Sequence, residues 1–167
     1  YQMPDMPADA EEGILKGMYR VRPSQHQRRR KRAHLFGSGA ILNEAIKAQL
    51  ILEEEYGIAA DVWSVTSYKQ LHEDGARVER WNLLHADEPP RQAYVAQVLE
   101  GATGAFVMAS DYVKALPDSI ARWFPSPPVC LGTDGFGRSE SRPALRSYFG
   151  VDAATIAWAA LAGLSRQ

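Results

Sequence analysis

The stretch AHLFGSGAILNEAIKAQLILEEEYGIAADVWSVT, residues 33–66, decides the fold. Its two ends, Ala33–Phe36 and Asp61–Thr66, are short runs that predict strands, the second of them rich in β-branched and aromatic residues. Between them, apolar residues recur at helical spacing from Ile41 to Tyr56, and Gly57 is a natural helix stop. A strand, a helix and a second strand in this order favour a parallel sheet.

Three further strands are predicted outside this stretch, over Met18–Arg22, Gly104–Ala109 and Val129–Thr133. We expect Met18–Arg22 to form a hairpin with Ala33–Phe36 or to lie beside it, and so to supply one antiparallel edge strand. The chain is therefore predicted to be a three-layer α/β/α domain with about five mostly parallel strands.

Helices are predicted between and after these strands. Ser67 and Gln70 form a capping-box signature for a short helix that ends near Gly75. Two more short helices are expected between residues 78 and 100, on either side of Pro89-Pro90. Another is expected over residues 111–124, where Pro117 should kink or restart it. Helices over 143–149 and 153–164 close the chain.

The first residues differ in character from the rest. Pro4, Pro7 and Gly13 lie among acidic residues with few large apolar side chains, which is typical of an arm or linker. We therefore expect residues 1–16 to be a linker from a preceding domain and residues 17–167 to be the folded domain. The absence of an initiator methionine at position 1 suggests a fragment of a longer polypeptide.

Composition excludes several classes of protein. The 167 residues carry a net charge of -1, which gives no overall field for binding nucleic acid or a membrane. We find no apolar run that approaches the roughly 20 residues of a membrane helix, and no signal peptide. The single cysteine, Cys130, rules out an intramolecular disulfide and fits a reducing compartment. We expect a cytoplasmic protein.

Gly37–Gly39 lies between a strand and a helix, where backbone amides can hold a phosphate. As a dinucleotide fingerprint it is incomplete, because Leu42 occupies the third glycine position. The acid expected at the end of the second strand is also missing. A tight strand-to-helix turn is favoured, and a nucleotide-binding module stays a weaker hypothesis.

The most unusual stretch is Thr133–Arg142, which follows a predicted strand and precedes a helix. Open α/β sheets place ligand sites at this position. Arg138 and Arg142 can bind a carboxylate or phosphate, and Ser139 or Ser141 can cap the helix. A structured loop whose arginines pair with acids across an interface is an equally good interpretation. The candidate contact residues are Asp134, Phe136, Arg138, Ser139 and Arg142.

Other features give no active site. The five cations Arg28–Arg32 can bind an acidic surface, but on a loop such a run is more often a solvated tip. The four histidines show no metal-ligand spacing, and no adjacent nucleophile and base can be identified. From the residues alone we expect no catalytic, cofactor-binding or metal-binding residue in this domain.

Six strings of sequence resemble a known family. In chain order they are EEGILKGMY (residues 11–19), LFGSGAIL (35–42), ADVWSVTS (60–67), ERWNLLH (79–85), ASDY (109–112) and LGTDGFGRS (131–139). The series resembles the C-terminal domain of the homodimeric, decarboxylating component of the bacterial pyruvate dehydrogenase complex, within the transketolase-like superfamily. The resemblance spans nearly the whole chain.

The resemblance implies that the full-length enzyme uses thiamine diphosphate and magnesium to decarboxylate pyruvate oxidatively. It further implies two partners, a second subunit of a homodimer and the dihydrolipoyl acetyltransferase that receives the acetyl group. The family's thiamine motif is Gly-Asp-Gly followed by a metal-binding Asn. Thr133–Gly135 is only superficially similar, because no Asn follows it. We therefore expect this domain to be non-catalytic, to bind no cofactor alone, and to support the dimer and the active-site architecture.

A free-standing regulatory or protein-interaction α/β domain is the alternative hypothesis. It would use the aromatic and arginine side chains of its surface to bind a protein. The length of the parent reading frame distinguishes the two, because an upstream region containing Gly-Asp-Gly and the later Asn would favour the enzyme domain.

Overall fold

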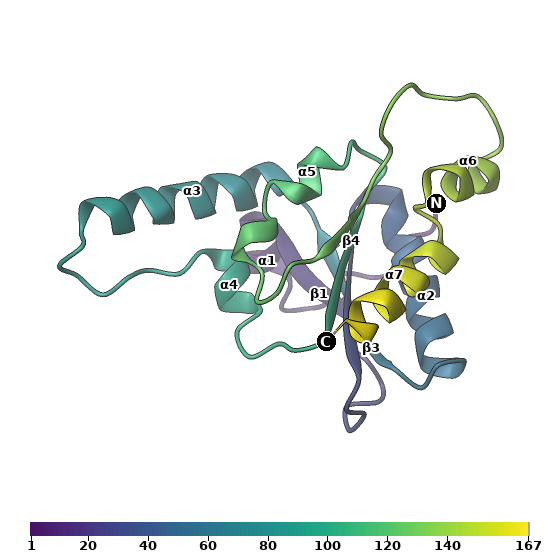
Figure 1. The fold of residues 1–167 in the computed structure, drawn as a ribbon, viewed down its shortest axis with the longest axis horizontal. Coiled ribbons are helices and arrows are strands. Elements are labelled where there is room, and N and C mark those ends of the chain that lie inside the picture. Colours follow the sequence, from purple (N-terminus) through teal and green to yellow (C-terminus); the bar gives the residue numbers. More distant parts are fainter. Residues whose placement is uncertain (167) are drawn as a thin grey trace.

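The computed structural model describes residues 1–166 and has a five-stranded sheet at its centre, with helices on both faces (Figure 1). The spatial order of the strands is β1-β3-β2-β4-β5. β1 pairs antiparallel with β3, and the other neighbours are parallel. The predicted three-layer architecture with one antiparallel edge strand is confirmed. The strands are β1 (Met18–Arg22), β2 (Arg32–Gly37), β3 (Ala59–Val65), β4 (Ala105–Ala109) and β5 (Val129–Leu131).

The predicted pairing of the first two strands is wrong, because β3 lies between β1 and β2. β2 is buried along almost its whole length, as suits a central strand, whereas β1 is half-exposed and lies at the edge. The loop between them is fastened at Ser24, whose backbone N–H donates to Asp61 Oδ1 of β3 at 2.7 Å. The Ser24 hydroxyl also donates to Glu53. These bonds hold the loop beside β3.

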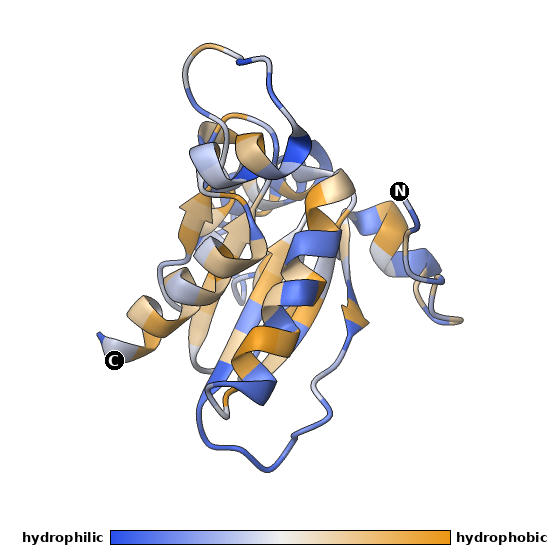
Figure 2. Cartoon of the chain, turned by 90° about the vertical axis from the view of Figure 1, so that its right-hand side faces the viewer, coloured by the Kyte–Doolittle hydropathy of each residue, from blue (hydrophilic) through white to orange (hydrophobic). Residues whose placement is uncertain are grey.

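The helices divide between the two faces of the sheet. α2 (Leu42–Glu54) and α7 (Ala153–Ser165) cover one face, where they pack around Leu35, Val62 and Val107. The other face carries a second core around Phe36 and Trp63. In Figure 2 the strands are largely apolar in colour, whereas the long connecting loops are largely hydrophilic. The helices on the second face are α1 (Glu11–Lys16), α3 (Tyr68–Leu84), α4 (Tyr94–Val98) and α5 (Ala115–Asp118).

α3 is longer than predicted. Its start is confirmed, because Ser67 Oγ accepts from the Gln70 backbone N–H at 3.1 Å. The helix does not end at Gly75 but continues to Leu84, so the first of the two helices expected after residue 78 is its second half. A Cβ at Gly75 would lie 2.2 Å from the Trp123 ring. Glycine is therefore needed at this position for close packing and does not terminate the helix.

Residues 111–124 do not form the single helix that the sequence predicted. They form the short α5 and a 3-10 turn over Ala121–Trp123. Pro117 is the third residue of α5, in the first turn, where its missing N–H breaks no helical hydrogen bond. Pro117 therefore occupies a first-turn position, as predicted, but it neither kinks nor restarts a longer helix, because no helix directly precedes α5.

The segment Arg142–Ser165 has the length and the mean hydropathy, 1.2, of a candidate membrane span, contrary to our expectation from the sequence. It forms two helices, α6 (Arg142–Phe149) and α7. They meet at Gly150, whose φ of 66° is left-handed, and Asp152 caps α7 by accepting from the Thr155 N–H. Because α7 packs against α2 and β4, part of the apolar composition belongs to the core of the domain.

Candidate functional site

The carboxyl edge of the parallel strands is where the chain leaves the sheet in opposite directions. α2 follows β2 on one face, and α5 follows β4 on the other. This topological switch point is the usual ligand position in an open α/β sheet. Its two loops are joined by buried serines, because Ser38 Oγ donates to Ser110 Oγ at 2.9 Å.

Gly37–Gly39 forms a tight turn at this edge. A Cβ on Gly37 would lie 2.6 Å from the Cα of Leu42, so the strand and the helix could not approach as closely with any other residue. Gly39 has a φ of 52°, which suits glycine. Close backbone packing accounts for Gly37 and the left-handed φ accounts for Gly39, which supports the predicted structural role of the turn over nucleotide binding.

The root of the loop after β5 is firmly attached. The Thr133 hydroxyl donates to the Asp111 carbonyl at 2.6 Å, and the Thr133 N–H donates to the Tyr112 carbonyl at 2.8 Å. Asp134 Oδ1 accepts from the Lys114 backbone N–H, also at 2.8 Å. Asp134 therefore fastens the loop to the segment that follows β4.

Beyond Asp134 the loop projects from the domain (Figure 1). Phe136 is 97% exposed, and Ser139 is also exposed. Ser141 occupies the predicted N-cap position of α6, but neither predicted serine caps the helix through its side chain. Aromatic side chains are common among the main contact residues of protein interfaces, so Phe136 at the tip of this anchored loop is a candidate contact residue.

Arg138 and Arg142 lie on aromatic rings at the base of this loop. The guanidinium of Arg138 is 4.6 Å from the Tyr148 ring centre, and that of Arg142 is 4.7 Å from the Tyr1 ring centre. Both line one hollow of about 350 Å³, so the structure brings these two predicted residues together. Ser139 lines a neighbouring hollow.

Arg146 is a third cation of the same hollow that sequence analysis missed. Its spacing from Arg142, one helical turn, was the available signal. Arg146 donates to Glu44 Oε1 at 2.8 Å. By contrast, Arg138 and Arg142 form no ion pair within residues 1–166. These two side chains can therefore bind an external carboxylate or phosphate.

The basic run is only partly a solvated tip. Arg28, Arg30 and Lys31 are exposed, as predicted. Arg29 donates to the Glu53 carbonyl at 2.8 Å, near the end of α2, and Arg32 donates to Asp61 at 3.2 Å. Two of the five cations therefore stabilise the fold.

Cys130 is not an activated nucleophile. It lies in the edge strand β5 and is half-buried. Burial and, to a smaller extent, the nearby Asp118 together raise the pKa of its thiol to about 12. The thiol is therefore protonated at neutral pH.

The carboxyl edge offers groups suited to binding, namely cations and an exposed aromatic ring.

The sequence of this chain matches one protein family and several named relatives. A family model described as the transketolase-like TK C-terminal domain matches residues 17–152. The pyruvate dehydrogenase E1 component of Pseudomonas aeruginosa is 46% identical over 169 residues, which cover 99% of this chain and 19% of that protein. The corresponding Escherichia coli K12 protein is 44% identical over 168 residues, 100% of this chain and 18% of that protein. The chain thus spans about a fifth of the length of these relatives.

Solved structures show the same fold at low sequence identity. A structure described as a split gene transketolase, inactive beta4 tetramer, has a TM-score of 0.61 and 20% identity, and the match covers 98% of this chain and 46% of that one. The transketolase from Leishmania mexicana also has a TM-score of 0.61, with 19% identity over 93% of this chain and 19% of that one.

Proposed function

The chain belongs to the transketolase-like TK C-terminal domain family, and from this premise we propose that it is the C-terminal domain of a bacterial pyruvate dehydrogenase E1 component. The observation that carries the proposal is the identity of 41–46% to proteins of that name over nearly the whole chain. The full-length protein would decarboxylate pyruvate oxidatively in the cytoplasm and pass the acetyl group to a dihydrolipoyl acetyltransferase.

Thiamine diphosphate and magnesium would serve the full-length enzyme, but the residues of this domain do not fit them. The sequence has two Asp-Gly pairs that resemble part of the thiamine motif, and both aspartates already accept from backbone N–H groups, Asp134 from Lys114 and Asp74 from Tyr94. Within residues 1–166, no three His, Cys, Asp or Glu side chains gather as metal ligands would. We derive no catalytic step through this domain and assign it a supporting role.

The supporting role that fits best is contact with the second subunit of a homodimer. Phe136 supplies an exposed ring, and Arg138 and Arg142 supply cations without an acidic partner in the described residues. Aromatic and arginine side chains carry much of the binding energy of protein interfaces. The firm root at Thr133 and Asp134 would hold this loop ready for binding, which limits the entropy lost on association.

Two measurements on the full-length protein test the proposal. It should release CO2 from pyruvate when supplied with thiamine diphosphate and magnesium, and a lack of pyruvate-dependent activity would contradict the assignment. Arg138→Ala should weaken the dimer and lower activity at low protein concentration, because it removes one of the free cations. If neither dimer stability nor activity changed, the loop would be a bystander.

A further inference from the structure

A hollow of about 670 Å³ lies at the opposite, amino edge of the sheet. It lies between α1 and α4, and strands β1, β2 and β3 form its floor. Its volume falls in the range of small-molecule sites, about 300–1,000 Å³. The side chains that converge there belong to Arg20, Arg32, His34, Asp61 and Trp63.

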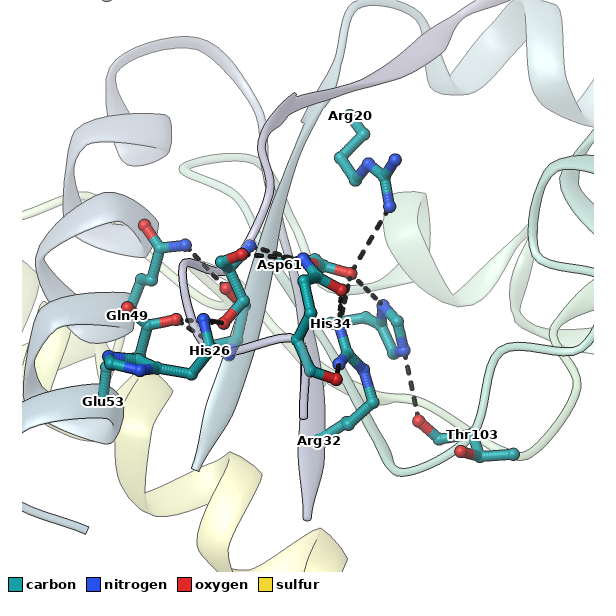
Figure 3. Close-up of polar contacts among 11 residues, drawn as sticks. Arg20, His26, Arg32, His34, Gln49, Glu53, Asp61 and Thr103 are labelled. Carbon is teal, nitrogen blue, oxygen red and sulfur yellow. Dashed lines mark hydrogen bonds and ion pairs between the residues drawn. The ribbon is translucent and has the colours of Figure 1, made fainter. Parts of the chain in front are cut away.

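Asp61 is the centre of the polar floor (Figure 3). Its side chain is 3% exposed, and its Oδ2 accepts from Arg32 at 3.2 Å. Two further nitrogens face the same oxygen, Arg20 Nη1 at 3.7 Å and His34 Nδ1 at 3.8 Å. Both distances exceed a hydrogen bond, so Arg20 and His34 surround Asp61 without closing on it.

Two buried nitrogens of this hollow have no hydrogen-bond partner within the described residues, His34 Nδ1 and Trp63 Nε1. His34 is 4% exposed and Trp63 is 6% exposed. The other imidazole nitrogen, Nε2, lies 3.2 Å from the Thr103 carbonyl, which can only accept, so Nε2 carries the proton. Buried polar groups nearly always have partners, so the unpartnered Trp63 N–H points to a missing acceptor, whereas Nδ1 of neutral His34 can only accept and offers nothing to an anion.

Arg20 can supply the main contact to that ligand. Its side chain is 50% exposed, and its guanidinium carbon lies 5.9 Å from the Trp63 ring centre. A guanidinium has five N–H donors, and the single long contact to Asp61 leaves most of them available. Two arginines against one aspartate leave one positive charge on the floor, which favours an anion.

The rim limits which anion can enter. Asp9, Glu12 and Glu100 also line the hollow; Glu12 is paired with Lys16 at 2.6 Å, and the other two carboxylates would repel a molecule that carries several negative charges. Val98 and Ala102 add apolar surface on the α4 side. A single negative charge attached to a small apolar body is the chemistry that matches both the floor and the walls.

We propose that the amino-edge cavity binds a small organic monocarboxylate, which Arg20 holds through its guanidinium and Trp63 through its indole N–H. The apolar body of the ligand lies against Val98 and Ala102. The site stands on the geometry of the amino edge and does not depend on the function proposed above.

Saturation-transfer NMR on the full-length protein, with benzoate as the probe, tests the site. Benzoate should receive saturation from the wild-type protein, and Arg20→Gln should weaken its binding by at least about tenfold, because a charge-assisted pair is lost. Trp63→Phe keeps the ring and deletes the N–H, so it should also weaken binding. Arg22→Gln is the matched control on the same strand, outside the cavity lining, and should bind like the wild type.

Two results would overturn the proposal. The first is a wild-type protein that gives no benzoate signal, or a signal that Arg20→Gln leaves intact. The second is an ATP signal that depends on Arg20, since the acidic rim should exclude a polyanion. Arg20 is exposed, so its replacement should leave the fold intact, and pyruvate turnover measured in parallel separates this site from the proposed enzyme function.

Discussion

The two edges of the sheet use the same residue types in different ways. At the amino edge, Arg32 and Asp61 bind each other inside the fold. At the carboxyl edge, Arg138 lies over an aromatic ring, and Asp134 bonds to a backbone N–H in an exposed loop. Removing one partner of a buried polar pair leaves the other uncompensated and is costly to the stability of the domain. Polar side chains that project without a partner contribute little to the fold and remain available for binding.

Asp61 and Asp134 differ in how deeply they are buried and in which segments they hold together. Asp61 is buried and takes bonds from Ser24 and Arg32, which come from two different segments of the chain. Asp134 is exposed and bonds a segment that its own loop already touches through Thr133. We therefore expect mutations of the buried polar residues at the amino edge to affect stability, and mutations of the exposed residues at the carboxyl edge to affect association.

Asp61→Ala should have the largest effect on stability. It leaves the Ser24 N–H and the Arg32 guanidinium without their buried acceptor and should cost about 4 kcal/mol. Asp134→Ala, the matched change at the other edge, should cost about 1 kcal/mol or less. Hydrogen exchange of β2 and β3 amides in the full-length protein measures both. Equal losses of stability in the two variants would contradict the proposed difference between the two edges.

Gly104→Ala and Gly135→Ala form a second pair. Both glycines have positive φ, 103° and 84°, so an alanine at either position adds backbone strain. At Gly104 the new Cβ would also lie 2.1 Å from the Arg32 carbonyl oxygen, whereas at Gly135 it would meet no atom within 4 Å. We expect losses of roughly 3 kcal/mol and about 1 kcal/mol, respectively, by the same exchange measurement. A larger loss at Gly135 would contradict the assignment of stability to the amino edge.

His34 should make the amino edge sensitive to acid. Burial lowers the pKa of its imidazole below 6.5, against the opposing pull of the Asp61 carboxylate. The folded state therefore binds its proton less readily than the unfolded state, and stability should fall as the pH drops below about 6.5. His34→Gln should reduce this fall between about pH 7.5 and pH 5.5 in exchange measurements corrected for intrinsic rates. An unchanged pH dependence would show that His34 is not the acid-sensitive group.

The strands could be predicted from the sequence, but one of the pairings could not. Short apolar runs between turn residues, such as Ala105–Ala109 between Gly104 and Ser110, indicate strands. The partner of Met18–Arg22, by contrast, depends on Ser24, which bonds to Asp61 and Glu53 far along the chain. Proximity in sequence favoured a hairpin, and these long-range bonds favour pairing with β3.

The role of Gly75 and the position of the amino-edge cavity also depend on contacts that the sequence does not reveal. Gly75 has the local signature of a helix end, and only the Trp123 ring packed against it shows why a glycine lies inside α3. The candidate loop could be located because its glycines and arginines follow a strand. The amino-edge cavity could not, because its floor comes from three strands whose order was predicted wrongly and its walls from α1 and α4.

Subunit dissociation of the full-length protein, measured by analytical ultracentrifugation, tests the central claim most directly. Phe136→Ser changes a side chain that is 97% exposed in this chain, so the domain should stay folded while the dissociation constant rises at least about tenfold. Tyr56→Ser, at an exposed aromatic residue away from the loop, should leave it unchanged. A dissociation constant that Phe136→Ser does not alter would contradict the role of the carboxyl-edge loop as a subunit contact.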